Sequence, residues 1–263
     1  MIQVNDMKNM TRNTRKRAIL EAAKHQIAPD NLGKLEQPFK LARILDNFIS
    51  DYIEVTITQN NKLGQNSILD NENLRLALRE KLDFYLSQAL DKVVSDPRSV
   101  ADMMKNPLNA YELAGAKELA FANKITRNLS TTMGSLWEKL ADISPHAANP
   151  ELEFGLKIKG IDIICKNIET GLIEFIQLKT TKNTLTGSQS GRTNSELRLY
   201  KNPVFAAAFD VSRGWTFQND PNIPRIAGQE FWSRIGMDYQ IVYEEVVRAI
   251  KQLEAKFVAA VSL

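Results

Sequence analysis

The stretch GIDIICKNIETGLIEFIQLK, at residues 160–179, decides the fold because two apolar runs flank a short polar turn. Ile, Leu and Phe dominate both runs, and the turn at residues 167–171 contains Asn and Gly, a pattern typical of a β-hairpin. We therefore predict an antiparallel pair whose first strand is 151–165 and whose second strand is 172–179.

The register of this hairpin brings three polar side chains together. If the turn is centred between Glu169 and Thr170, Asp162 faces Gln177 across the pair, with Cβ atoms about 5 Å apart. Lys179 lies two residues beyond Gln177 and points to the same face, because side chains alternate along a strand. An acid, a second oxygen donor and a lysine are thus expected near one end of the hairpin.

The rest of the chain indicates an α/β protein. Apolar residues at helical spacing predict helices at 11–25, 39–52, 72–94, 108–124 and 239–257. Residues 203–211 (PVFAAAFDV) are typical of a buried strand, whereas the polar residues 180–194 lack a core period and suggest a loop. We predict a mixed β-sheet flanked by helices, with a mainly helical region at 1–125 and the sheet-containing core at 126–263.

Composition narrows the class of protein. The chain has 263 residues, 43% hydrophobic and 25% charged, which is ordinary for a folded protein. Its net charge of +3 is too small to identify a nucleic-acid binder. Cys165 is the only cysteine, which excludes an intrachain disulfide and a cysteine-rich zinc site and favours a reducing, cytoplasmic setting. The basic N-terminus lacks a signal-peptide core, and no stretch approaches the roughly 18 apolar residues of a membrane span.

Common catalytic motifs are missing from the sequence. It contains no Walker A motif, HExxH, GxSxG or CxxC pair. The two histidines, His25 and His146, stand in contexts that do not suit a triad or a metal cage. Chemistry based on carboxylates of the hairpin is therefore the remaining candidate for a catalytic function.

The elements GID at 160–162 and QLK at 177–179 resemble the PD-(D/E)xK signature of type II restriction endonucleases. The resemblance covers about the second half of the chain. The sequence departs from the signature in two places, because no proline precedes Asp162 and Gln177 replaces the usual second acid. The preceding helix offers Glu138 where these enzymes often present an auxiliary glutamate.

The resemblance implies Mg²⁺-dependent hydrolysis of double-stranded DNA at a specific short sequence. Mg²⁺ is expected on Asp162, Gln177, the Leu178 carbonyl and Glu138, while Lys179 orients or deprotonates the attacking water. An amide is a weaker ligand than a carboxylate for this hard cation, which affects the expected affinity or number of ions. A palindromic target implies a homodimer, in which the helical region could support dimerisation.

The polar stretch after Lys179 is a candidate for DNA recognition because it combines a basic surplus with amide and hydroxyl side chains. The residues expected to contact DNA are Lys182, Asn183, Ser188, Gln189, Arg192, Asn194 and Arg198. The basic residues at 12–17 could also contact the DNA backbone, although a solvated basic face fits that pattern better.

Other interpretations remain open at this stage. Each polar residue singled out above could be a solvated surface residue with no role in catalysis or binding. The chain could be a structure-specific or repair nuclease of the same fold. It could also be a DNA-binding module without catalysis, for which Gln177 is the main argument.

Overall fold

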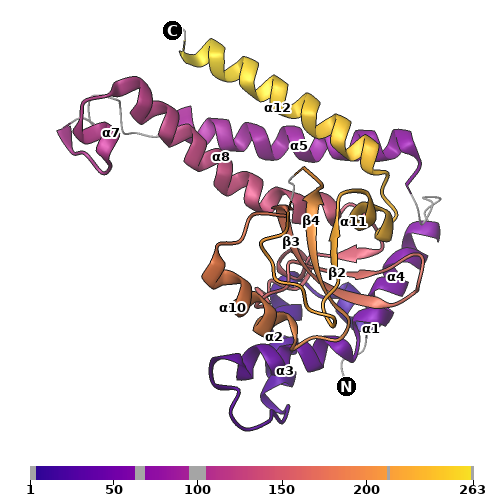
Figure 1. The fold of residues 1–263 in the computed structure, drawn as a ribbon. Coiled ribbons are helices and arrows are strands. Elements are labelled where there is room, and N and C mark those ends of the chain that lie inside the picture. The colour runs from indigo at the N-terminus through magenta and orange to yellow at the C-terminus, as the bar shows by residue number, and fades with distance from the viewer. Residues whose placement is uncertain (1–3, 63–68, 95–104, 212–213, 262–263) are drawn as a thin grey trace.

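The computed structural model describes residues 4–62, 69–94, 105–211 and 214–261. Within these residues a five-stranded sheet lies between two groups of helices (Figure 1). The strands, in spatial order, are β1 (Ala147–Ala148), β2 (Ile163–Lys166), β3 (Ile173–Thr181), β4 (Pro203–Phe209) and β5 (Arg225–Ala227). The pairs β1/β2 and β2/β3 are antiparallel, whereas β3/β4 and β4/β5 are parallel. The predicted mixed sheet flanked by helices is confirmed.

The N-terminal helices cover one face of the sheet and lie below it in Figure 1. They are α1 (Val4–Asn9), α2 (Arg12–Lys24), the 3₁₀ turn η1 (Gly33–Leu35), α3 (Glu36–Asp46) and α4 (Ile49–Lys62). The prediction of one helix at 39–52 was wrong. The N–H groups of Asn47 and Phe48 bond to carbonyls three residues back, which tightens the last turn and ends α3 before α4 begins.

Three long helices and a short one cover the opposite face. The long ones are α5 (Asn71–Val94), α8 (Lys117–Ala141) and α12 (Tyr239–Val261), the short one is α11 (Gln229–Arg234), and α7 (Ala110–Leu113) precedes α8. The helices predicted at 72–94 and 239–257 are confirmed. The single helix predicted at 108–124 was wrong, because Gly115 adopts a φ of +69° between α7 and α8.

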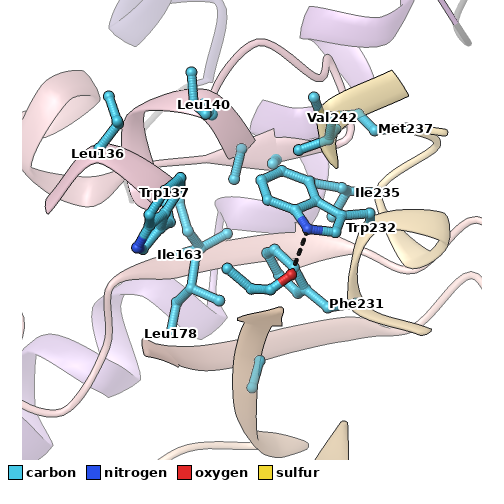
Figure 2. Packing of buried hydrophobic residues seen from close by; sticks show 14 of the residues in the cluster. Leu136, Trp137, Leu140, Ile163, Leu178, Phe231, Trp232, Ile235, Met237 and Val242 are labelled. Carbon is cyan, nitrogen blue, oxygen red and sulfur yellow. Dashed lines mark hydrogen bonds between the residues drawn. The ribbon is translucent and has the colours of Figure 1, made fainter. Parts of the chain in front are cut away.

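The buried apolar side chains of the described residues form one cluster on each face of the sheet. Alternation along the strands separates them, since Ile176 and Leu178 of β3 belong to one cluster and Phe175 to the other. Figure 2 shows the first cluster, where Trp137 of α8 and Trp232 of α11 lie near Ile163 and Leu178. Each cluster combines side chains from residues 1–125 with side chains from residues 126–263.

Two connections next to the strands are helical where the sequence suggested otherwise. Residues predicted as the start of a strand at 151–165 form α9 (Pro150–Phe154), because Asn149 caps the helix and Pro150 occupies its first turn. The loop predicted at 180–194 becomes α10 (Gly187–Leu197) from Gly187 onward. The face that α10 buries includes Ser190, Thr193 and Glu196, so an apolar period is missing from its sequence.

No helix in the described part of the chain combines the length and the apolar character needed to cross a bilayer.

Candidate active site

The hairpin has the register that the sequence predicted. Ile163 pairs with Ile176 and Lys166 with Ile173, and the N–H of Asp162 donates to the carbonyl of Ile176 at 2.9 Å. This bond goes to the residue that already pairs with Ile163, so the regular register ends at Ile163 and Asp162 lies at a bend beside it. Strand β2 itself begins only at Ile163, so Asp162 lies where the regular strand starts.

Asp162 is held by the neighbouring strand. Its Oδ2 accepts a hydrogen bond of 2.8 Å from the backbone N–H of Leu178. Burial raises the pKa of this carboxyl, while the Lys179 ammonium and the Leu178 N–H act in the opposite direction. Because the N–H and C=O of one strand residue point to the same edge, the Leu178 carbonyl also faces the edge at which Asp162 lies.

Gln177 presents an acceptor without a partner. Its side chain is only 9% exposed, and Oε1 is buried and makes no hydrogen bond with any described residue. A buried acceptor left unpaired costs roughly 1–3 kcal/mol, so such an atom needs an explanation. In β3 the side chain of Gln177 shares its face with Phe175 and Lys179.

Glu138 reaches this site from α8. Burial and, next, the negative charge of Asp162 raise the pKa of its carboxyl to about 7. Both side chains line the same cleft. The Lys179 ammonium and a hydrogen bond from Asn149 Nδ2 to Glu138 Oε2, at 3.4 Å, act in the opposite direction. Asp162, Lys179 and Glu138 are thus brought together from two strands and a helix.

Asn149 is a site residue that sequence reasoning missed. It is buried, its Oδ1 caps α9 by accepting from the N–H groups of Glu151 and Leu152, and its N–H donates to Asp142 Oδ1 at 2.9 Å. The dipeptide Asn149-Pro150 is a recognisable helix start. It could have revealed the cap, although not the contact with Glu138.

A cleft of about 290 Å³ opens beside the two carboxyls. Its walls are formed by Ser135, Glu138, Asn149, Pro150, Glu151, Leu156, Lys157, Ile158, Ile161 and Asp162. A larger cleft of about 430 Å³ lies between α5 and the end of α8 and includes Asp142, but no residue of the hairpin lines it. The smaller cleft is therefore the one that adjoins the predicted site.

The donors at this site fit a hard cation. Carboxylate, amide and backbone carbonyl oxygens are the ligands that Mg²⁺ accepts, and a cation would relieve the repulsion between Asp162 and Glu138. The described residues contain no cluster of three or more His, Cys, Asp or Glu side chains able to hold a metal. Amide and carbonyl oxygens must therefore complete the set, and the unpartnered Gln177 Oε1 is an available amide oxygen.

The cations predicted to contact DNA are paired within the chain. Lys182 forms an ion pair with Asp210, and Arg192 pairs with Glu196 at 2.8 Å. Arg198 donates to Asp220 Oδ2 at 2.6 Å. The acids outside the polar stretch thus offset the basic surplus that the sequence suggested.

The uncharged residues predicted to contact DNA also have local roles, with one exception. Asn183 Oδ1 accepts from the Thr181 hydroxyl at 2.8 Å, and Gln189 forms the capping box of α10 with Thr186. Asn194 Nδ2 donates to Asp220 Oδ2 at 2.6 Å. Ser188 is exposed near the start of α10.

A scan against models of known protein families finds no match, and a search of curated proteins finds no relative. The functional argument therefore rests on the residues and their arrangement.

Proposed function

We propose that this protein is a Mg²⁺-dependent endonuclease that hydrolyses double-stranded DNA at a specific short sequence, similar to type II restriction enzymes with a PD-(D/E)xK site. The observation that carries the proposal is the Asp162 carboxylate, which accepts from the Leu178 N–H of β3 while Glu138 of α8 lines the same cleft. A chance match to a short motif gives no reason for a second acid to arrive from a separate helix.

The residues have distinct roles in this proposal. Asp162, Gln177, Glu138 and the Leu178 carbonyl would hold Mg²⁺, which supplies charge neutralisation at the scissile phosphate and lowers the pKa of the attacking water. Lys179 is near both carboxyls and contributes a positive charge that stabilises developing negative charge on the phosphate. Burial around Asp162 and Glu138 strengthens each of these electrostatic interactions.

Recognition is assigned to α10 and the segment before it. Ser188 and Arg192 are one helical turn apart on α10, and both are exposed. Lys182, Arg192 and Arg198 would exchange their acid partners for phosphates or base edges when DNA arrives. The polar residues Asn183, Gln189 and Asn194 would contribute hydrogen bonds to the DNA.

The wider setting follows from the same proposal. A palindromic site is matched by a protein with two-fold symmetry, so we expect a homodimer, which sedimentation of the purified protein tests. Cys165 is a free buried thiol, which is compatible with the reducing cytoplasm where such an enzyme meets foreign DNA.

The test is digestion of plasmid DNA by purified protein with Mg²⁺ or with EDTA, followed by mapping of the ends. Discrete fragments support a site-specific enzyme, whereas a smear or cutting only at unusual DNA structures favours a repair nuclease of the same fold. The control is Asp162→Asn, which keeps the shape of the side chain and an oxygen for the Leu178 N–H. DNA binding without metal-dependent cutting would identify a binding module, an outcome that Gln177 in place of an acid favours.

A further inference from the structure

Three exposed cations on α2 have no partner. Arg12, Lys16 and Arg17 make no ion pair or hydrogen bond with any residue that the structure describes. This contrasts with Lys182, Arg192 and Arg198 around α10, each of which is paired with an acid. Unpaired exposed cations can bind phosphate without first giving up a partner, so they contribute more to net affinity.

Two of these cations lie beside Gly155, next in sequence to a residue of the cleft wall. A Cβ built on Gly155 would lie 3.3 Å from Arg12 Nε and 3.5 Å from Lys16 Cδ, so both side chains cross directly over this glycine. The next residue, Leu156, is part of the cleft wall that also includes Glu138 and Asp162. Consecutive Cα atoms are about 3.8 Å apart, which places the Arg12 and Lys16 side chains next to that wall.

Two acids of α9, the helix that ends at Gly155, are already paired. Glu153 accepts from Arg15 at 3.0 Å and also from the Tyr52 hydroxyl, and Glu151 lies 3.6 Å from Lys157. These acids therefore do not offset the charges of Arg12 and Lys16.

The position of the cations in α2 is also unfavourable for the helix. α2 begins at Arg12 after the Thr11 cap and has no acid in its first turn. The positive end of the helix dipole thus coincides with basic side chains at the start of α2. Basic residues at a helix N-terminus go against the usual preference for acids there, and such departures are expected at functional sites. The start of α2 is therefore strongly electropositive.

We propose that Arg12 and Lys16 bind the phosphate backbone of the DNA duplex that enters the cleft beside Asp162 and Glu138. The inference rests on the proposed nuclease function, since the cleft gives the duplex its place. It assigns to the N-terminal helical region a direct part in holding substrate, on the side of the sheet opposite α8 (Figure 1). Because phosphate contacts carry no sequence information, this part of the binding should be independent of DNA sequence.

The test compares two double variants that remove the same charge from different places. Arg12→Gln with Lys16→Gln removes the proposed contacts. Lys24→Gln with Arg43→Gln is the control, because these exposed cations are paired with Glu21 and Asp46 on their own helices. Glutamine has nearly the helix propensity of Lys and Arg, so both variants should stay folded, which thermal unfolding checks.

Binding is measured by fluorescence anisotropy with a labelled duplex of arbitrary sequence, about 30 base pairs long, in EDTA across a salt series. Each lost phosphate contact should reduce the slope of log affinity against log salt by about 0.9. For the Arg12 and Lys16 variant, the fall in affinity between about 50 and about 200 mM salt should be roughly tenfold smaller than for wild type. The control variant should keep the wild-type slope.

Each outcome separates this inference from the proposed function. If wild type cuts DNA but both double variants keep its slope, or lose it equally, the phosphate contact is overturned and the nuclease stands. If wild type never cuts but the slope falls only in the Arg12 and Lys16 variant, the contact stands and the nuclease fails. Absence of any duplex binding by wild type would overturn the contact.

Discussion

Gln177 offers a prediction in which stability and metal binding change in opposite directions. We expect Gln177→Met to make the metal-free protein more stable while reducing its response to Mg²⁺. Methionine keeps the unbranched shape of glutamine and removes the buried Oε1 that has no partner in the described chain. Its thioether is a soft donor that Mg²⁺ does not favour.

The magnitude follows from the unpaired acceptor. Removing a buried unsatisfied polar atom should raise the free energy of unfolding by roughly 1–3 kcal/mol. For a chain of this size, each kcal/mol corresponds to a rise of roughly 2–4 °C in the unfolding temperature. If Mg²⁺ binds the wild type, a hundredfold excess over Kd should stabilise it by about 2.7 kcal/mol, and the variant should gain clearly less.

The assay is thermal and urea denaturation of both proteins in EDTA and in a Mg²⁺ series, with plasmid cleavage measured in parallel. Gln177→Glu is the opposite change, because it adds a carboxylate near Asp162 where Gln177→Met removes an oxygen. It should lower the stability of the metal-free protein and lower the Mg²⁺ concentration needed for half-maximal cleavage. A Gln177→Met variant that is less stable in EDTA, or that gains as much from Mg²⁺ as wild type, would falsify the assignment of Oε1 as a ligand.

Three further perturbations test the site. Asp162→Asn should abolish Mg²⁺-dependent nicking while DNA binding measured by gel shift persists or tightens, and normal nicking would remove Asp162 from the site. The pKa of Glu138 is raised by burial from 4.5 to about 7, so the folded state binds this proton more tightly than the unfolded state. The free energy of unfolding of the metal-free protein, from urea titrations, should therefore fall as pH rises between those values, and Glu138→Gln should reduce that fall. Gly160→Ala should lower the unfolding temperature more than Gly171→Ala. Both glycines have positive φ, but only a Cβ at Gly160 would meet another atom, Glu196 Cβ at 2.9 Å. Equal shifts in unfolding temperature would contradict this clash.

The sequence was sufficient for the hairpin register because its two strands are strongly apolar and one turn joins them. The pairing of Ile163 with Ile176 follows from that turn alone. Helices with a regular apolar stripe, such as α5 and α12, were predictable for the same reason.

The remaining features depend on tertiary contacts or on short signals. α10 buries Ser190 and Thr193, so its sequence carries no apolar period and only the capping box at Thr186 marks its start. The partners Asp210 and Asp220, which neutralise the basic residues after β3, are distant in sequence from those residues. Their pairing could not be deduced from the local excess of positive charge.

An amide at position 177 has a physical rationale in the metal-free protein. Burial and the charge of Asp162 already raise the pKa of Glu138 to about 7. A third carboxylate at residue 177, next to the Leu178 N–H that Asp162 accepts from, would add repulsion in a partly buried site that Lys179 alone cannot neutralise. Glutamine supplies an oxygen without that repulsion, at the cost of weaker attraction for Mg²⁺. The nuclease that we propose should therefore need a higher Mg²⁺ concentration for half-maximal cleavage than an all-acid site, because the ion must bind a set of oxygens that holds one charge fewer.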